Sequence, residues 1–169
     1  MAVAGIDVGS LTTKVVVMDN GNILGKVVDL SSEEVEISAK RALEEALKQA
    51  GLKKEDLTGI VATGAGRKSI SFATGQKTTM SCLAKGINLL QPSVRTLFDV
   101  GAETSSVLRL SPKGLVEDSV GHDRCASGTG VFLQSMSKLM MMSLEDFAKL
   151  STTTDNRAEV STMCAIFAE

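Results

Sequence analysis

The strongest constraint on the fold is a pattern that occurs twice in the chain. Residues 6–9 read Ile-Asp-Val-Gly and residues 98–101 read Phe-Asp-Val-Gly, which places Asp7 and Asp99 92 positions apart. The same offset matches Gly9 with Gly101, Thr12 with Thr104 and Val15 with Val107. A unit repeated at this distance predicts two related lobes. The alternative is that two short apolar strands share Asp-Val-Gly by coincidence, and the matching spacing of turns and strands argues against it.

Each copy predicts three strands joined by tight turns. In the first copy, apolar runs cover residues 2–6, 13–18 and 23–30. The tetrapeptide at 19–22, Asp-Asn-Gly-Asn, predicts a hairpin because Asn and Gly tolerate a positive φ. In the second copy the corresponding turn is slipped by one residue, to Ser-Pro-Lys-Gly at 111–114, and residues 115–118 supply the third strand.

Helices are expected after each set of strands. Ser31 and Glu34 have the spacing of a capping box, apolar residues then recur with helical period, and Gly51 stands where a helix ends. A short buried strand at 60–63 follows. Ser143 is placed to cap a further helix, because acidic residues occupy the turn after it. The remaining predicted helices cover residues 80–90, about 132–142, and about 155 to 169.

The composition excludes several functional classes. The chain has 169 residues and a net charge of −2, so no basic field favours nucleic acid or anionic lipid. A single histidine, His122, argues against a multi-histidine metal site and a histidine-based triad. No run approaches the roughly 18 apolar residues of a membrane helix, and the start carries Asp7 without a basic segment. We therefore expect a cytoplasmic protein with reduced thiols and no membrane partner.

The repeated Asp-x-Gly turn has a chemistry of its own. Glycine lets the backbone approach an anion and turn N–H groups toward it, and the neighbouring carboxylate can hold a hydrated Mg²⁺. One such turn is commonly only a tight turn, whereas a facing pair could grip a polyphosphate. Hydroxyl donors and a point charge accompany the first turn, at Ser10, Thr12, Thr13 and Lys14.

The three cysteines leave two interpretations open. Cys125 precedes a glycine-rich turn and a predicted helix, where the helix dipole favours the thiolate that binds soft metals and iron–sulfur clusters. Its separation from Cys164 matches no zinc or ferredoxin spacing, and on spacing alone buried free thiols are the simpler interpretation. If both are ligands, one chain supplies half of a four-cysteine site, and a two-fold dimer completes it.

A series of motifs spans the whole chain: GIDVGSLTTKVVVMD (5–19), TGAGR (63–67), AKG (84–86), DVGAE (99–103), DRCASGTGVFLQSM (123–136) and MCAIFAE (163–169). This series resembles the activator, or activase, ATPases of 2-hydroxyacyl-CoA dehydratases and benzoyl-CoA reductases, within the acetate kinase, sugar kinase, Hsp70 and actin superfamily. The resemblance implies an α/β fold of ribonuclease H-like lobes, each beginning with a three-stranded antiparallel meander. Residues 1–95 form the first lobe. Residues 96–169 begin a second, incomplete lobe that carries the cluster-ligand helices, so a fragment is expected.

The resemblance also implies an activity. Family members are homodimers that share one [4Fe–4S] cluster, held by two cysteines of each subunit, which are Cys125 and Cys164 here. Reduced ferredoxin or flavodoxin supplies an electron. ATP binding and hydrolysis, with Mg²⁺, then drive its transfer to a partner dehydratase or reductase in anaerobic metabolism. Cys82 lies outside both ligand motifs and is expected to be a structural thiol.

The nucleotide residues carry over by position. The first phosphate loop comprises Asp7, Gly9, Ser10, Thr12, Thr13 and Lys14, and the second comprises Asp99 and Gly101. The family's second loop usually reads Asp-Ile-Gly-Gly-Gln-Asp-Ser/Thr-Lys, whereas this chain has DVGAETSS. Glu103 stands at the glutamine position, where it could position water, so Asp7, Asp99 and Glu103 are the candidate catalytic residues. The altered loop leaves two alternatives: an activase for another low-potential metalloenzyme, such as the methanogenic coenzyme M reductase, or a nucleotide-sensing module without redox work.

Overall fold

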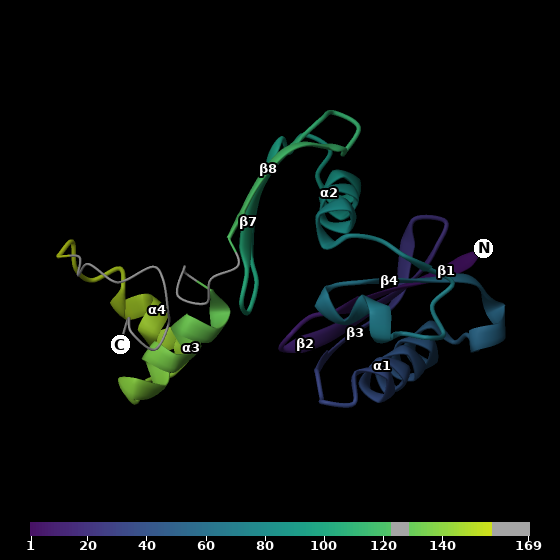
Figure 1. Ribbon diagram of the computed structural model, residues 1–169, viewed down its shortest axis with the longest axis horizontal. Helices are drawn as coiled ribbons and strands as arrows, with labels where there is room; N and C mark the ends of the chain where they lie inside the picture. The colour runs from purple at the N-terminus through teal and green to yellow at the C-terminus, as the bar shows by residue number, and fades with distance from the viewer. Residues whose placement is uncertain (123–128, 157–169) are drawn as a thin grey trace. The chain divides into compact units, whose positions relative to one another are not determined.

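The chain folds into two compact units, Met1–Leu90 and Gln91–Glu169. The computed structural model describes residues 1–122 and 129–156. Figure 1 traces the elements in chain order, from the purple N-terminal strand to the yellow helix α4 (Leu144–Leu150). No helix in these described ranges is long and apolar enough to cross a bilayer.

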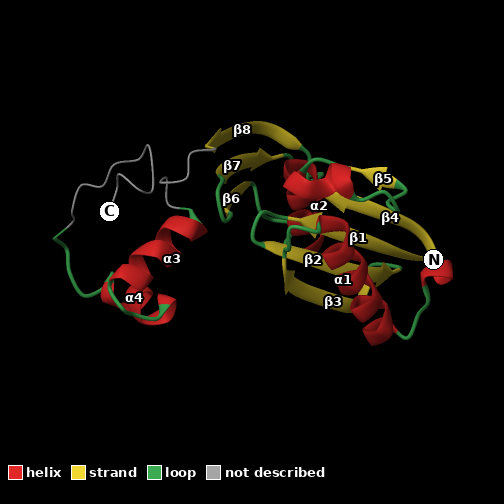
Figure 2. Ribbon diagram, turned by 60° about the horizontal axis from the view of Figure 1, so that its bottom comes forward, coloured by secondary structure: helices red, strands yellow, loops and turns green. Residues whose placement is uncertain are grey.

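The first unit is built on a five-stranded sheet in the order β3-β2-β1-β4-β5 (Figure 2). The first three strands form an antiparallel meander, and β4 joins β1 in parallel after the crossover helix α1. A second helix, α2, and two short 3₁₀ turns complete the unit. The elements are β1 (Ala2–Val8), β2 (Thr12–Asp19), β3 (Asn22–Leu30), α1 (Val35–Ala50), η1 (Lys54–Asp56), β4 (Leu57–Thr63), η2 (Ala65–Ser69), β5 (Gly75–Gln76) and α2 (Thr79–Leu90).

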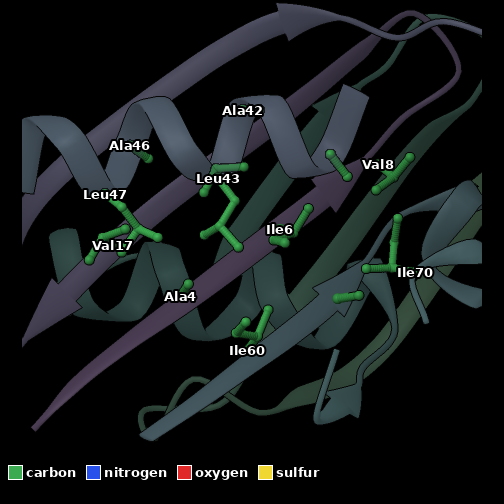
Figure 3. Packing of buried hydrophobic residues seen from close by; sticks show 13 residues of the cluster. Ala4, Ile6, Val8, Val17, Ala42, Leu43, Ala46, Leu47, Ile60 and Ile70 are labelled. Carbon is green, nitrogen blue, oxygen red and sulfur yellow. The ribbon is translucent and has the colours of Figure 1, made fainter. Parts of the chain in front are cut away.

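The core of this unit lies between α1 and one face of the sheet (Figure 3). Alternate residues of β1 and β2 are buried, as expected for strands covered on one face. Along α1 the buried residues recur at helical spacing, so its apolar stripe faces the strands. The fully buried side chains that meet here include Ile6, Val15, Val17, Ala39 and Ala46.

A glycine sets how closely the helix approaches the sheet. A Cβ placed on Gly25 of β3 would lie 2.2 Å from Ala46 O and 3.3 Å from Ala50 N, both backbone atoms of α1. We expect Gly25→Ala to lower the free energy of unfolding by about 2 kcal/mol, because the helix must shift to admit the methyl group. Chemical denaturation measures this. Gly5→Ala is the matched control, since nothing lies within 4 Å of its Cβ, and equal stability of the two variants would contradict the expectation.

The second unit begins with a second antiparallel meander, in the order β6-β7-β8. Its register repeats that of the first: Asp7 pairs with Lys14, and 92 positions later Asp99 pairs with Ser106. Both middle strands have a register irregularity against the third strand at equivalent places, Val17/Met18 and Arg109/Leu110. The predicted repeat is therefore confirmed. The elements are β6 (Thr96–Val100), β7 (Ser105–Leu110), β8 (Val116–His122), α3 (Gly130–Leu139) and α4 (Leu144–Leu150).

The hairpin turns follow the sequence prediction. Gly21 and Gly114 have φ values of 83° and 64°, and Asn20 has a φ of 49°. These left-handed conformations are the ones that Asn and Gly adopt at low cost. The two glycines are 93 positions apart, which is the predicted slip of one residue.

Two expected helix boundaries are wrong and two are confirmed. Gly51 ends α1 in the left-handed conformation, and the Ser143 hydroxyl accepts a hydrogen bond from Asp146 N at the start of α4. The capping box at Ser31 does not form, because α1 begins after Glu34 with no side-chain cap. Helix α3 ends at Leu139 rather than 142, because Met141 takes a φ of 52° and Met142 N bonds back to Ser137 O. The predicted final helix lies outside the described residues.

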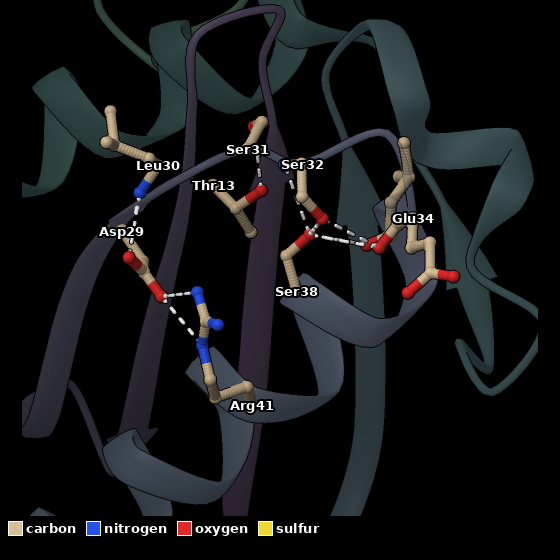
Figure 4. Close-up of polar contacts among 9 residues, drawn as sticks. Thr13, Asp29, Leu30, Ser31, Ser32, Glu34, Ser38 and Arg41 are labelled. Carbon is tan, nitrogen blue, oxygen red and sulfur yellow. Dashed lines mark hydrogen bonds and ion pairs between the residues drawn. The ribbon is translucent and has the colours of Figure 1, made fainter.

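An ion pair joins the edge strand to α1. Asp29 accepts a hydrogen bond from Arg41 Nε at 3.0 Å and another from the N–H of Leu30 (Figure 4). Both contacts hold the pKa of Asp29 below its usual value, with Arg41 as the larger cause. The Asp29 contacts therefore stabilise the folded state at pH values above the usual carboxyl pKa. This stabilisation is lost as the pH falls through the lowered pKa of Asp29.

Candidate functional site

The turn between β1 and β2 is tied down through its carbonyl groups. Gly9 N donates to Thr12 O at 3.0 Å, which closes the turn. The Ser31 hydroxyl donates to Gly9 O at 2.9 Å, and Ser31 N donates to Leu11 O at the same distance. Ser31 was expected to cap a helix, and it instead fixes this turn, a role that its position in the sequence does not reveal.

This arrangement directs backbone N–H groups outward. In a trans peptide the carbonyl and the N–H point in opposite directions. Because Gly9 O points to Ser31, the N–H of Ser10 points away from it, and Ser10 is exposed. Across the described ranges, the backbone N–H groups of Ser10 and Leu11 have no hydrogen-bond partner. The turn can therefore receive an anion through its backbone.

The carboxylate of Asp7 lies directly before this turn. Its Oδ2 is 3.2 Å from Lys14 Nζ, across the antiparallel pair, and the Asp7 side chain is about one third exposed (32%). The first turn therefore brings together an accessible carboxylate, an ammonium group, the outward N–H of Ser10 and the N–H of Leu11. Thr12 is half-buried on the following strand.

Thr13 has a different position from the other predicted phosphate ligands. Its side chain is fully buried, and its hydroxyl lies 3.0 Å from the Ser31 hydroxyl (Figure 4). Thr13 therefore contacts the turn indirectly, through the Ser31 hydroxyl that donates to Gly9 O.

The end of β4 lies beside Asp7. The sequence prediction did not include this strand end in the site. Asp7 pairs with Thr63 in parallel register, and Gly64 follows at once. A Cβ on Gly64 would lie 2.3 Å from Val8 O and 2.6 Å from Asp7 Oδ1. The glycine-rich segment TGAGR was the signal for this neighbour, because the carboxyl ends of parallel strands meet at one edge of a sheet.

The second turn is tied down in an equivalent way. Gly101 N donates to Thr104 O at 2.8 Å, as Gly9 N does to Thr12 O in the first copy. Here the carbonyls of Gly101 and Ala102 accept from the first two N–H groups of α3, those of Gly130 and Val131, at 2.8 and 2.9 Å. The N–H groups of Ala102 and Glu103 consequently point away from α3. The first N–H groups of α3 thus bind the carbonyls of the second turn, as Ser31 binds those of the first turn.

The carboxylate groups of the second turn differ in setting from Asp7. Asp99 is half-buried and faces Ser106 where Asp7 faces Lys14, so a hydroxyl stands where the first copy has an ammonium group. Glu103 is exposed at the tip of the turn. Within the described residues, no group of three or more His, Cys, Asp or Glu side chains could hold a metal ion. Cys125 and Cys164 lie outside the described residues.

A groove of about 350 Å³ lies elsewhere in the first unit. It is bounded by α1, the segment 52–54 and the ring of Phe72, and lysines line much of its rim. None of the predicted site residues lines it. The candidate residues therefore lie at the two Asp-x-Gly turns, one in each unit, and not at this groove.

Both the sequence and the fold of the chain are similar to those of known dehydratase activators. The chain is 38% identical over 171 residues to the activator of lactoyl-CoA dehydratase of Anaerotignum propionicum, covering all of this chain and 65% of that protein. It superimposes with a TM-score of 0.87 on component A of the (R)-2-hydroxyglutaryl-CoA dehydratase of Acidaminococcus fermentans, at 32% identity, covering 99% of this chain and 65% of that one. The chain also superimposes on the activator of the 2-hydroxyisocaproyl-CoA dehydratase from Clostridium difficile with bound ADPNP, with a TM-score of 0.85 at 32% identity. This match covers 99% of this chain and 63% of that one.

These likenesses confirm the predicted α/β fold, because the two activator structures match nearly the whole chain. The chain spans a little under two thirds of the length of these relatives. The model of the BadF/BadG/BcrA/BcrD ATPase family matches residues 4–169. The chain belongs to the BadF/BadG/BcrA/BcrD ATPase family.

Proposed function

We propose that this protein is an ATP-dependent activator that passes a low-potential electron to a partner 2-hydroxyacyl-CoA dehydratase or benzoyl-CoA reductase. The observation that carries the nucleotide part is the pair of Asp-x-Gly turns, each with its carbonyls tied back and its N–H groups directed outward. Such turns suit phosphate oxygens, because their N–H groups are already oriented when the anion arrives.

The roles of individual residues follow from their positions. The N–H groups of Ser10 and Leu11 bind phosphate, and Gly9 keeps the turn tight enough for its closing hydrogen bond. Thr12 and Lys14 add a hydroxyl and a positive charge. In the second turn, Gly101 and the outward N–H groups take the same part. To Asp99 and Glu103 we assign the orientation of the attacking water.

Magnesium fits the donor set of the first turn. In phosphate sites Mg²⁺ is bound through one or two carboxylates and phosphate oxygens, and it keeps several waters. Asp7 supplies an accessible carboxylate beside the phosphate-binding N–H groups. When bound, the ion neutralises charge on the phosphates.

The redox part rests on the two cysteine motifs. Cys125 and Cys164 give each chain two thiolates, which fit half of a four-thiolate [4Fe–4S] site. A two-fold homodimer brings four thiolates together on its axis. When bound, such a cluster supplies one-electron transfer at low potential. We assign reduced ferredoxin or flavodoxin as the donor and place the protein in the cytoplasm, where thiols stay reduced.

The altered second turn favours one alternative within the same class. Ala102 stands where the family's usual pattern has glycine, and Ser106 stands where it has lysine, facing Asp99. An activase for another low-potential metalloenzyme, such as the methanogenic coenzyme M reductase, is therefore the second candidate. A nucleotide-sensing module without redox work is the third.

Anaerobically purified, full-length protein separates these functions. We expect ATP hydrolysis that requires Mg²⁺, and a broad visible absorption band that fades with dithionite. Activation assays with a 2-hydroxyacyl-CoA dehydratase, a benzoyl-CoA reductase and coenzyme M reductase then identify the partner class. If the protein stays colourless after iron–sulfide reconstitution but still binds nucleotide, both activase functions are excluded and the nucleotide-sensing module is the remaining candidate. Absence of nucleotide binding would overturn the proposal as a whole.

A further inference from the structure

A buried hydroxyl without a partner lies next to the proposed nucleotide site. Thr63 ends β4 and is 9% exposed. Its Oγ1 is buried and has no hydrogen-bond partner in the part of the chain that the structure describes. An unpaired buried hydroxyl is destabilising, so such groups are usually satisfied by water or a ligand.

The register of the sheet points Thr63 to the same side as Asp7. Strands β1 and β4 are parallel, and Asp7 and Thr63 are direct partners in that pairing. Partner residues in adjacent strands project from the same face of a sheet. On both strands the alternate residues Ile6 and Ala62 face the buried core with α1. Asp7 and Thr63 therefore share the opposite face, at the carboxyl end of the two strands.

The next residue locks this strand end against the carboxylate. Gly64 has a φ of 88° and packs against Val8 O and Asp7 Oδ1 more closely than any side chain allows. Arg67 Nη1 donates to Gly64 O at 2.9 Å, which closes the segment on itself. Thr63 is thus held beside Asp7 by a rigid turn.

The two oxygens of the Asp7 carboxylate have different neighbours. Oδ2 contacts the ammonium group of Lys14 at 3.2 Å. Oδ1 lies toward Gly64, the residue that follows Thr63. The Asp7 oxygen that Lys14 does not contact therefore lies toward the end of β4, the strand that carries Thr63.

We propose that Thr63 is a positioning residue of the magnesium–nucleotide site, whose hydroxyl holds a water of the ion's hydration shell beside Asp7. This rests on the proposed function, because it requires Mg²⁺ and a nucleotide at the first turn. Mg²⁺ gives up its waters reluctantly, so a protein holds it partly through groups that bind those waters. Thr63 supplies such a group, and its hydroxyl then gains the partner that the free protein lacks.

The test compares Thr63→Val, which keeps the shape, with Thr63→Ser, which keeps the hydroxyl, in the full chain. Thermal unfolding is measured without nucleotide, and binding of ADPNP is measured as a function of Mg²⁺ concentration. We expect Thr63→Val to unfold at an equal or higher temperature than the wild type, because it removes an unpaired buried hydroxyl. It should need about tenfold more Mg²⁺ for half-maximal ADPNP binding, while Thr63→Ser stays close to the wild type.

Thr63→Ala removes the same hydroxyl with a smaller side chain and must show the same shift in Mg²⁺ dependence. An unchanged Mg²⁺ dependence in Thr63→Val, with ADPNP still bound, would overturn the role of Thr63 and leave the proposed function intact. A marked loss of stability of the nucleotide-free Thr63→Val and Thr63→Ala variants would also overturn it, since the hydroxyl would then have a structural partner. Failure of the wild type to bind Mg²⁺–ADPNP would instead refute the proposed function.

Discussion

Replacing Asp7 by alanine will lower kcat for Mg²⁺-dependent ATP hydrolysis by the full-length protein by a factor of at least about 10². The carboxylate is the only acidic side chain of the first turn, and it lies beside the N–H groups that are placed to bind phosphate. In the proposed site Asp7 is the protein ligand of the magnesium ion, so without it the charge that develops on the phosphates would no longer be neutralised in a fixed position. Steady-state hydrolysis at saturating ATP and Mg²⁺ measures the effect.

The fold should tolerate this change. Lys14 loses its partner, but its side chain is 45% exposed, so water replaces the ion pair. Asp29→Ala is the matched control, because it also removes a carboxylate paired with a cation in the first unit, on β3 and not in the β1–β2 turn. We expect that variant to hydrolyse ATP at the wild-type rate. Loss of a transition-state contact lowers kcat by far more than about threefold. A kcat of Asp7→Ala within about threefold of the wild-type value would therefore contradict the role of Asp7.

The second large effect concerns the cysteine motifs. Cys125→Ser in the full-length protein is expected to abolish the visible absorption band and to release the iron, because a serine hydroxyl is protonated at neutral pH and is a poor ligand for a soft metal centre. Iron content per dimer and the absorption spectrum before and after dithionite measure this. In the proposed homodimer one substitution removes two of the four thiolates, so the loss should be complete.

Cys82→Ser is the control for thiol loss in general. Cys82 is a free, half-buried cysteine on α2 and lies outside both ligand motifs. Its replacement should leave the spectrum and the iron content unchanged. A Cys125→Ser variant that keeps its iron would refute the ligand assignment, whereas loss of iron in both variants would point to general instability of the protein.

The local features of the fold could be predicted from the sequence. The meanders follow from alternating apolar residues and from Asn-Gly and Gly turns, which restrict the backbone within a few residues. The offset of 92 positions predicted that Asp99 would repeat the setting of Asp7, and the register of the two sheets agrees. Gly51 and Ser143 mark helix ends for the same local reason.

The two wrong predictions have different causes, a distant partner in one case and an unusual backbone conformation in the other. Ser31 has the spacing of a helix cap, but its hydroxyl and N–H bond to Gly9 and Leu11, which lie some twenty residues earlier. Helix α3 ends early because Met141 takes a left-handed conformation, which a methionine rarely adopts and which sequence pattern does not indicate.

The sequence by itself determined the strands of the two meanders, the tight turns, the repeat and the acidic residue near the end of the first strand of each copy. The tertiary structure alone decided which groups of the turns are available to a ligand. Hydrogen bonds from Ser31 and from the start of α3 take up the carbonyls, and parallel pairing of β1 with β4 brings Thr63 beside Asp7. These contacts join residues far apart in the chain, so their geometry exists only once the sheets and helices have packed.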